Sequence, residues 1–120
     1  MLNQNAQQLD HVFRALADAN RRAIIDQLSR GPASVSELAR PLGVTLAAVV
    51  QHLQVLEQGG LVRSEKVGRV RTCHIESSGL DAARDWLGER RALWERRLDR
   101  LGEVLAEQKQ EKVKKRKRDE

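Results

Sequence analysis

Four side chains of this sequence could act as soft metal ligands or as thiol and imidazole catalysts: His11, His52, Cys73 and His74. A transition-metal site needs about three or four such ligands that converge on one point. These side chains stand in different sequence contexts, so we predict no metal site and no cofactor. We also find no Ser/His/Asp or Cys/His set, phosphate-binding loop or pair of acid/base carboxylates in a suitable context. The sequence therefore predicts that the protein is not an enzyme.

A different chemistry is indicated by VTLAAVVQHLQVLEQGGLV, residues 44–62, which holds one ionised side chain, Glu57, in a chain of net charge +5. Val49, Leu53 and Leu56 recur at helical spacing and predict a core-facing stripe. The opposite face has small, apolar or amide side chains: Leu46, Ala47, Val50, Gln51 and Gln54. Solvated helix faces are normally charged. This segment is therefore either ordinary core or in contact with a partner that does not need charge.

Three helices are predicted before this segment. Apolar residues over 9–16 recur at i, i+3, i+4 and i+7, which is typical of an amphipathic helix. Asp18 can cap a second helix, which stops at the Gly-Pro pair 31–32. The sequence SVSE at 34–37 is a capping box that opens a short helix. Proline and glycine within 41–43 end this helix after about two turns.

A fourth helix, a hairpin and a long last helix are predicted after these three. Thr45 caps a fourth helix that closes at the glycines 59–60, and β-branched residues around a Gly68-Arg69 turn predict a hairpin over 61–76. The helical period returns at Ser78 in an apolar stripe of about 28 residues, or about 40 Å, which needs a partner helix. The predicted fold class is mainly α with a small β-hairpin. It is a winged helix-turn-helix, in the order α-α-α-α-β-β-α, with a long C-terminal helix for dimerisation.

The length of 120 residues predicts one domain, over 1–106, followed by a tail over 107–120. The tail holds seven Lys/Arg against four Asp/Glu and one apolar residue, Val113, so we predict a disordered basic segment. The body before it carries a net charge of about +2, which by itself is a weak argument for nucleic-acid binding.

Composition excludes several classes of protein. The aromatic residues are Phe13, Trp86 and Trp94, too few for the stacking platforms that bind single strands or RNA. No apolar run approaches the length of about 18 residues that a membrane span needs, and the N-terminus lacks the pattern of a secretory signal. The single cysteine cannot form an internal disulfide, which agrees with a reducing cytoplasm.

The chain resembles the ArsR/SmtB family of bacterial winged-helix transcriptional regulators from about Asp10 to Leu105. The resemblance rests on SVSELA, then QHLQVLEQGGLV and EKVGR, followed by WLGERRALWERRLDRLGEVL. It implies a homodimeric repressor that binds an inverted repeat in double-stranded DNA, with the Thr45 helix in the major groove. Many members are released from DNA by metal ions. Here the short helix has no Cys and the last helix no His, so the chain is similar to the metal-free, SdpR-like branch.

This resemblance gives the uncharged face a function. A Gln amide can bond to adenine N6 and N7, and apolar side chains can contact the thymine methyl. Positive side chains around the helix would contact phosphates, and Thr45 could do so while it caps the helix. The predicted DNA-binding residues are Arg40, Thr45, Leu46, Ala47, Val50, Gln51, Gln54, Lys66, Arg69 and Arg71.

The first and last helices would form the dimer interface, through Leu9, Val12, Phe13, Trp86, Leu87, Trp94, Leu98 and Leu101. Several alternatives remain open. Trp86 and Trp94 could line a ligand pocket, and the wing residues could form a solvated hairpin tip. His52 could be a packed histidine or a phosphate contact, and Cys73 an inert buried thiol or a redox switch. The whole fold could also serve as a protein-protein interaction module, and the sequence specifies no inducer.

Overall fold

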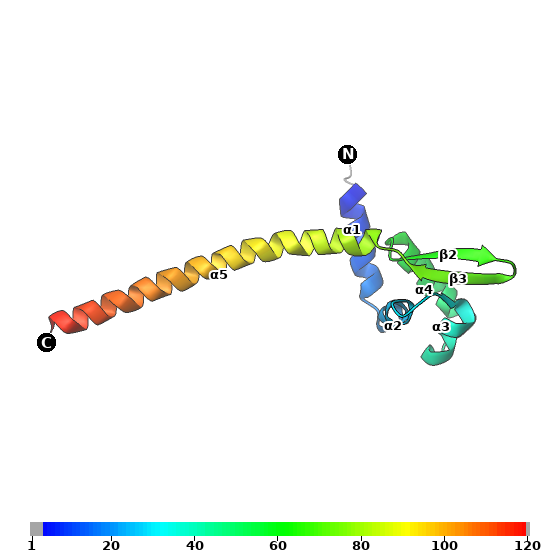
Figure 1. Ribbon diagram of the computed structural model, residues 1–120, viewed down its shortest axis with the longest axis horizontal. Helices are drawn as coiled ribbons and strands as arrows, with labels where there is room; N and C mark the ends of the chain where they lie inside the picture. Colours follow the sequence, from blue (N-terminus) through cyan, green and yellow to red (C-terminus); the bar gives the residue numbers. More distant parts are fainter. Residues whose placement is uncertain (1–3, 120) are drawn as a thin grey trace. The chain divides into compact units, whose positions relative to one another are not determined.

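The computed structural model describes residues 4–119, which form five helices and three strands (Figure 1). The chain divides into two compact units, Met1–Arg84 and Asp85–Glu120. The predicted order of helix, helix, short helix, helix, hairpin and long helix is confirmed in the described residues. Within 4–119, no helix is both long and apolar enough to cross a membrane.

The first two helices, α1 (Gln4–Leu16) and α2 (Ala19–Leu28), are joined by a short turn. Asp18 caps α2 as predicted, because its Oδ2 accepts a hydrogen bond from the Arg21 amide at 3.1 Å. That bond lowers the pKa of the Asp18 carboxyl, since it stabilises the ionised form.

The short helix α3 (Val35–Leu42) begins with the predicted capping box. The Ser34 hydroxyl accepts from the Glu37 amide at 3.2 Å, and the Glu37 carboxylate accepts from the Ser34 amide at 3.2 Å. Pro41 lies inside the last turn of α3 rather than beyond it, and Gly43 ends the helix in the left-handed conformation with φ of 64°. A three-residue turn then leads into α4 (Leu46–Gln58).

The sheet has one more strand than the sequence predicts. Strands β2 (Val62–Val67) and β3 (Val70–Ile75) form the expected antiparallel hairpin, and β1 (Ala33–Ser34) pairs with the other edge of β3. A strand of two residues has no room for alternation, and its partners Cys73 and Thr72 lie about forty positions later in the chain. This pairing is therefore invisible to local sequence patterns.

One core joins the first four helices to the sheet. Its fully buried side chains come from every one of these elements except β1: Val12, Ala15, Ile24, Leu38, Val49, Leu53, Leu56, Leu61, Val62 and Cys73. Ala33 of β1 is also buried against this cluster. The core fixes α3, α4 and the hairpin relative to one another.

A turn of two glycines joins the end of α4 to the hairpin and has no room for larger residues. Gly60 has φ of 68°, and the Leu61 amide reaches back to the Leu56 carbonyl at 3.0 Å, which completes a helix-ending Schellman motif. A Cβ at Gly79 would overlap the carbonyl oxygen of Gly59. The close approach of these backbones fixes the point at which the wing begins.

The last helix, α5 (Ser78–Arg118), is longer than predicted and continues through most of the segment expected to be disordered. No change of conformation marks the predicted boundary at residue 106. Glu, Gln, Lys and Arg are good helix formers, and this segment has no Gly or Pro after Gly102. Glu111 stands four residues before Lys115, and the basic last turn complements the helix dipole.

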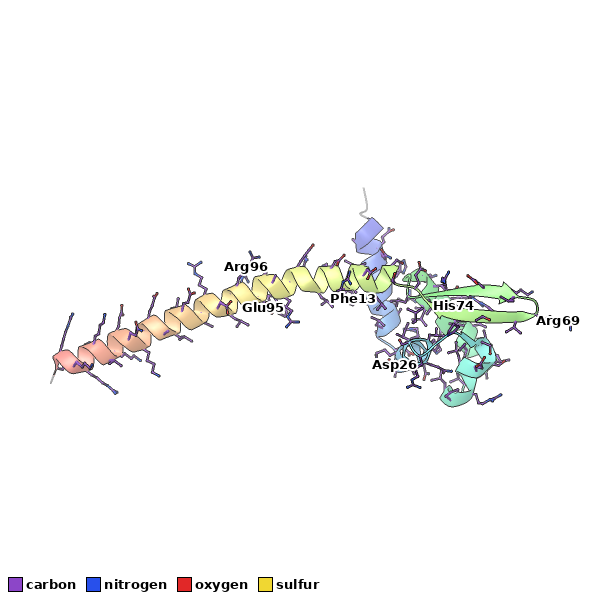
Figure 2. All side chains as sticks on the ribbon, in the orientation of Figure 1. Phe13, Asp26, Arg69, His74, Glu95 and Arg96 are labelled. Atoms are coloured by element: carbon purple, nitrogen blue, oxygen red, sulfur yellow. The ribbon has the colours of Figure 1, made fainter. Side chains whose placement is uncertain are left out.

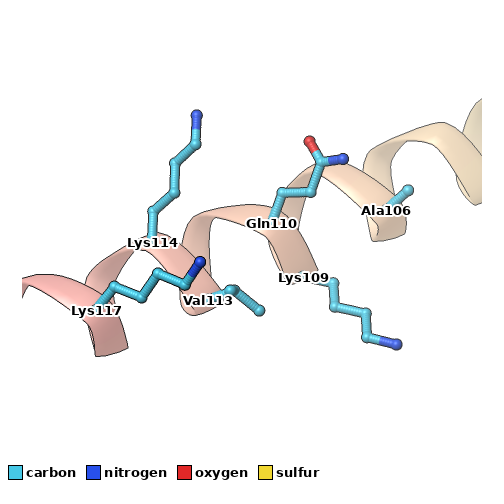
Figure 3. Close-up of a pocket in the computed structure, with 6 residues that line it drawn as sticks. All are labelled: Ala106, Lys109, Gln110, Val113, Lys114 and Lys117. Carbon is cyan, nitrogen blue, oxygen red and sulfur yellow. The ribbon is translucent and has the colours of Figure 1, made fainter.

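The side chains at the end of α5 surround a single helix (Figure 3). Ala106, Lys109, Gln110, Val113, Lys114 and Lys117 line a shallow hollow there. All six are exposed, so this hollow is open helix surface and not a ligand cavity.

Candidate nucleic-acid interface

The N-terminus of α4 is fixed by a cap. The Oγ1 of Thr45 accepts a hydrogen bond from the Ala48 amide at 3.1 Å, so the predicted capping role is confirmed. Thr45 is exposed and stands at the positive end of the helix dipole. A phosphate could bind at the same place without displacing the cap.

The two faces of α4 are as different in the structure as in the sequence. Val49, Leu53 and Leu56 are fully buried, which confirms the predicted core stripe. On the other face Leu46 is 54% exposed, Val50 is partly buried, and Ala47, Gln51 and Gln54 are exposed. This surface offers amide groups and methyl groups without a formal charge.

Positive side chains stand on the neighbouring elements. Arg40 is exposed near the end of α3, and Lys66 is exposed on β2. Arg69 lies at the far end of the hairpin, next to Gly68, whose φ of 63° permits the tight turn (Figure 2). These three residues have the exposure that contact with phosphates requires.

Arg71 differs from the other predicted phosphate contacts. Its Nη2 donates a hydrogen bond to Glu57 Oε1 at 2.9 Å, and its Nε donates to Ser64 Oγ at 2.9 Å. Arg71 stands beside the wing tip as predicted, since its pair with Lys66 is next to the closing pair of the hairpin, but its guanidinium is bound within the chain. Its contact with DNA stays a prediction. The guanidinium turns back toward α4 because a carboxylate and a hydroxyl there accept both of its bonds.

His52 packs beside the start of α2. Its Nδ1 lies 3.5 Å from Arg21 Nη1 and 3.9 Å from Asp18 Oδ2. Arg21 also donates to the carbonyls of Ala15 and Arg14, at 2.8 and 2.9 Å. The interpretation of His52 as a packed histidine is confirmed, and its contact with a phosphate stays untested.

Cys73 is a buried, free thiol at the centre of the sheet. Burial raises its pKa, because the low-polarity surroundings disfavour the thiolate. This supports the inert alternative over a redox switch, since the thiolate is the reactive form. In the part of the chain that the structure describes, no group of three or more His, Cys, Asp or Glu is arranged to hold a metal ion.

The residues predicted for dimerisation fall into two groups. Val12 is fully buried in the core of its own chain, so its assignment to a dimer interface is wrong. It belongs to the amphipathic stripe of α1, but that stripe packs against α4, and Leu9 is partly buried. The other six predicted residues have exposed side chains on α1 and α5: Phe13, Trp86, Leu87, Trp94, Leu98 and Leu101.

Sequence reasoning missed Glu57 and Ser64 as parts of this interface. Glu57 was conspicuous as the one ionised residue in its segment, and the alternation of β2 puts Ser64 on the face of Val62. Their meeting with Arg71 depends on how the hairpin folds against α4, which local patterns do not record.

Comparison with known proteins agrees with this geometry. Residues 16–65 match the model of a helix-turn-helix domain family. A transcriptional regulator of the helix-turn-helix type, Rv2034 from Mycobacterium tuberculosis, is 40% identical over 96 residues, which cover 80% of this chain and 87% of that protein.

Two solved structures extend the comparison. An ArsR family transcriptional regulator has a TM-score of 0.71 and 48% identity, and the match covers 78% of this chain and 97% of that one. A homodimeric winged helix-turn-helix DNA-binding domain from Mycobacterium bovis, a possible ArsR-family regulator, has a TM-score of 0.58 and 29% identity. That match covers 80% of this chain and 90% of the other.

Fold and site together define a winged helix-turn-helix transcriptional regulator. Its sequence and structural relatives place the chain in the ArsR family, to which it belongs. The relatives named above are regulators and not enzymes, which confirms the prediction of a non-enzymatic function.

Proposed function

We propose that the protein is a homodimeric repressor that binds an inverted-repeat operator in double-stranded DNA. The observation that carries the proposal is the exposed, uncharged face of α4, flanked by exposed cations on α3 and the wing. Amides and methyl groups can distinguish base edges, while cations bind phosphates without regard to sequence. Neither set alone would give both affinity and specificity.

In this proposal Gln51 and Gln54 contact base edges in the major groove, with Leu46, Ala47 and Val50 available to thymine methyl groups. Arg40, Lys66 and Arg69 bind the backbone, and Thr45 presents a phosphate site at the start of α4. The wing tip can also reach a narrow minor groove with Arg69.

The dimer follows from the apolar side chains of α5. Trp94 and Leu98 are 64% and 65% exposed, and Leu101 and Leu105 continue the same heptad-like stripe. The homodimeric assembly of the Mycobacterium bovis domain supports this proposal. A bound dimer can repress by occupying a promoter, and the free Cys73 thiol is compatible with the cytoplasm.

A salt titration distinguishes this function from a protein-interaction module. The binding constant for a labelled duplex from the promoter beside the protein's own gene should fall steeply between about 50 and 200 mM salt. A random duplex of equal length should bind more weakly at every salt concentration. Equal binding of both duplexes, or no binding of either, would contradict a sequence-specific repressor.

A further inference from the structure

Three mutual hydrogen bonds link the strands of the wing to α4. Arg71 donates to both Glu57 Oε1 and Ser64 Oγ at 2.9 Å, and Ser64 Oγ lies 2.7 Å from the same Glu57 oxygen. Each pair of residues in this triad of Glu57, Ser64 and Arg71 is therefore in direct contact. The triad joins β2 and β3 to the last turn of α4.

The hydrogen bonds have one consistent direction. A guanidinium can only donate, and an ionised carboxylate can only accept. The Ser64 hydroxyl must therefore accept from Arg71 and donate its own proton to Glu57. The Glu57 and Arg71 side chains are 31% and 35% exposed, so their charges are partly shielded from water and cancel one another.

Two members of the triad lie on the wing, Ser64 in the middle of β2 and Arg71 nearer the tip. In the strand register Ser64 pairs with the buried Cys73, and Arg71 pairs with Lys66, two positions nearer the tip. Alternate residues of a strand share a face, so Val62, Ser64 and Lys66 lie on one face of β2. Along this face the side chains change from buried Val62 to partly buried Ser64 and exposed Lys66. On α4, Glu57 lies seven positions after Val50, on the same side of the helix.

We propose that the triad is a positioning device that fixes the wing against α4. Arg71 acts through Glu57 and Ser64 and does not bind a phosphate. The inference rests on the proposed function, because its consequence is that base contacts by α4 and phosphate contacts by the wing form simultaneously on one operator. The three residues are positioning residues, since none of them needs to touch DNA.

Removal of the negative charge of Glu57 tests this proposal. A negative charge near a DNA-binding surface repels phosphates, so its removal should strengthen binding if charge alone mattered. A positioning role predicts the opposite for Glu57. Glu65 provides the matched control, because it lies on β2 in an exposed ion pair with Arg63 at 3.4 Å and changes net charge by the same amount.

The experiment compares the variants E57Q, E65Q, R71Q and R69Q with the E57Q/R71Q double variant. Dissociation constants are measured for operator and random duplexes over a range of salt, at a temperature where circular dichroism shows every variant folded. We expect E57Q to weaken operator binding about tenfold, from the loss of charge-assisted hydrogen bonds, and E65Q to leave it unchanged or tighter. R71Q should match E57Q, and the double variant should be no worse than either, because the residues act as one unit.

The slope of the binding constant against salt concentration distinguishes a positioning residue from a residue that contacts a phosphate. R69Q should reduce the slope by about two ions per dimer, one from each protomer, whereas R71Q should leave it unchanged. The proposal is overturned if E57Q tightens binding as E65Q does, or if R71Q lowers the slope and its effect adds to that of E57Q.

Hydrogen exchange of the DNA-free protein tests the same device without a ligand. Amides of β2 and β3 should exchange about tenfold faster in E57Q than in E65Q if the triad holds the wing. Equal exchange in the two variants would overturn the proposal. A wild-type protein that binds no duplex would contradict the proposed function alone, since the exchange result decides the positioning role by itself.

Discussion

Gln51 is the residue on which the proposed base recognition depends most. It is exposed in the middle of α4, and its amide can both donate and accept at a base edge. Gln51→Ala should cost about 1–3 kcal/mol of binding free energy per lost contact on the preferred site, and relax the preference at one base pair in each half-site.

Gln58 offers a control for this substitution, because it is an exposed glutamine in the last turn of the same helix. Gln58→Ala should leave the preference unchanged. Competition between single-base variants of the operator measures both effects. A loss that is equal on every sequence would show that Gln51 does not read a base.

Cys73 gives a prediction on pH. Because burial raises the pKa of its thiol, the folded protein holds the proton more tightly than the unfolded chain. The stability linked to this group is complete below the unfolded pKa of about 8.5 and is lost as pH rises through the folded value.

We therefore expect slow alkylation of Cys73 at pH 8 in the native protein and rapid alkylation in denaturant. Mass spectrometry of iodoacetamide-treated samples checks the rates. Native labelling as fast as that of the unfolded chain would restore the redox alternative.

At the scale of elements, the features that sequence predicts are those with local causes. The caps at Asp18, Ser34 and Thr45 are read from single side chains and their neighbours, and all three are confirmed. What the sequence does not reveal is long-range. The pairing of β1, the burial of Val12 within its own chain and the turn of Arg71 toward Glu57 all depend on tertiary contacts.

The capping box of α3 has a measurable effect on stability. Ser34→Ala removes the acceptor for the Glu37 amide and should lower the free energy of unfolding by about 1 kcal/mol. Ser36→Ala, in the same first turn but outside the capping box, should have a smaller effect. Urea denaturation of the two variants makes the comparison, and an equal loss in both would contradict the capping role.

The basic end of α5 should contribute affinity without specificity. Deletion of residues 112–120 removes six Lys/Arg and two Asp/Glu. Its lysines, such as Lys114 and Lys117 (Figure 3), extend from an exposed helix, so they can bind phosphates but cannot read a sequence. The truncated protein should bind operator and random duplexes more weakly by a similar factor, with a flatter salt slope. A change in sequence preference would show that the reading surface has been misplaced.

For the whole molecule, recognition of an inverted repeat requires two copies of the chain. One α4 helix reads only a few base pairs, so an operator of useful length needs a second, symmetry-related helix. The exposed α5 stripe is the surface proposed to join them. Leu98→Glu should produce a monomer of 13.6 kDa in light scattering, whereas Arg96→Glu, on the other side of α5, should remain a dimer. A wild-type protein that is monomeric at micromolar concentration would refute this assembly.

The spacing of the half-sites in the operator tests whether a dimer reads two major grooves. Two α4 helices in successive major grooves require half-site centres about 10–10.5 bp apart. Duplexes selected by the protein from a random pool should therefore contain an inverted repeat of that spacing. Insertion of 5 bp between the half-sites turns one of them to the opposite face of the duplex. We predict that this insertion reduces affinity to that of a single half-site. Unchanged affinity would contradict a dimer that reads both grooves at once.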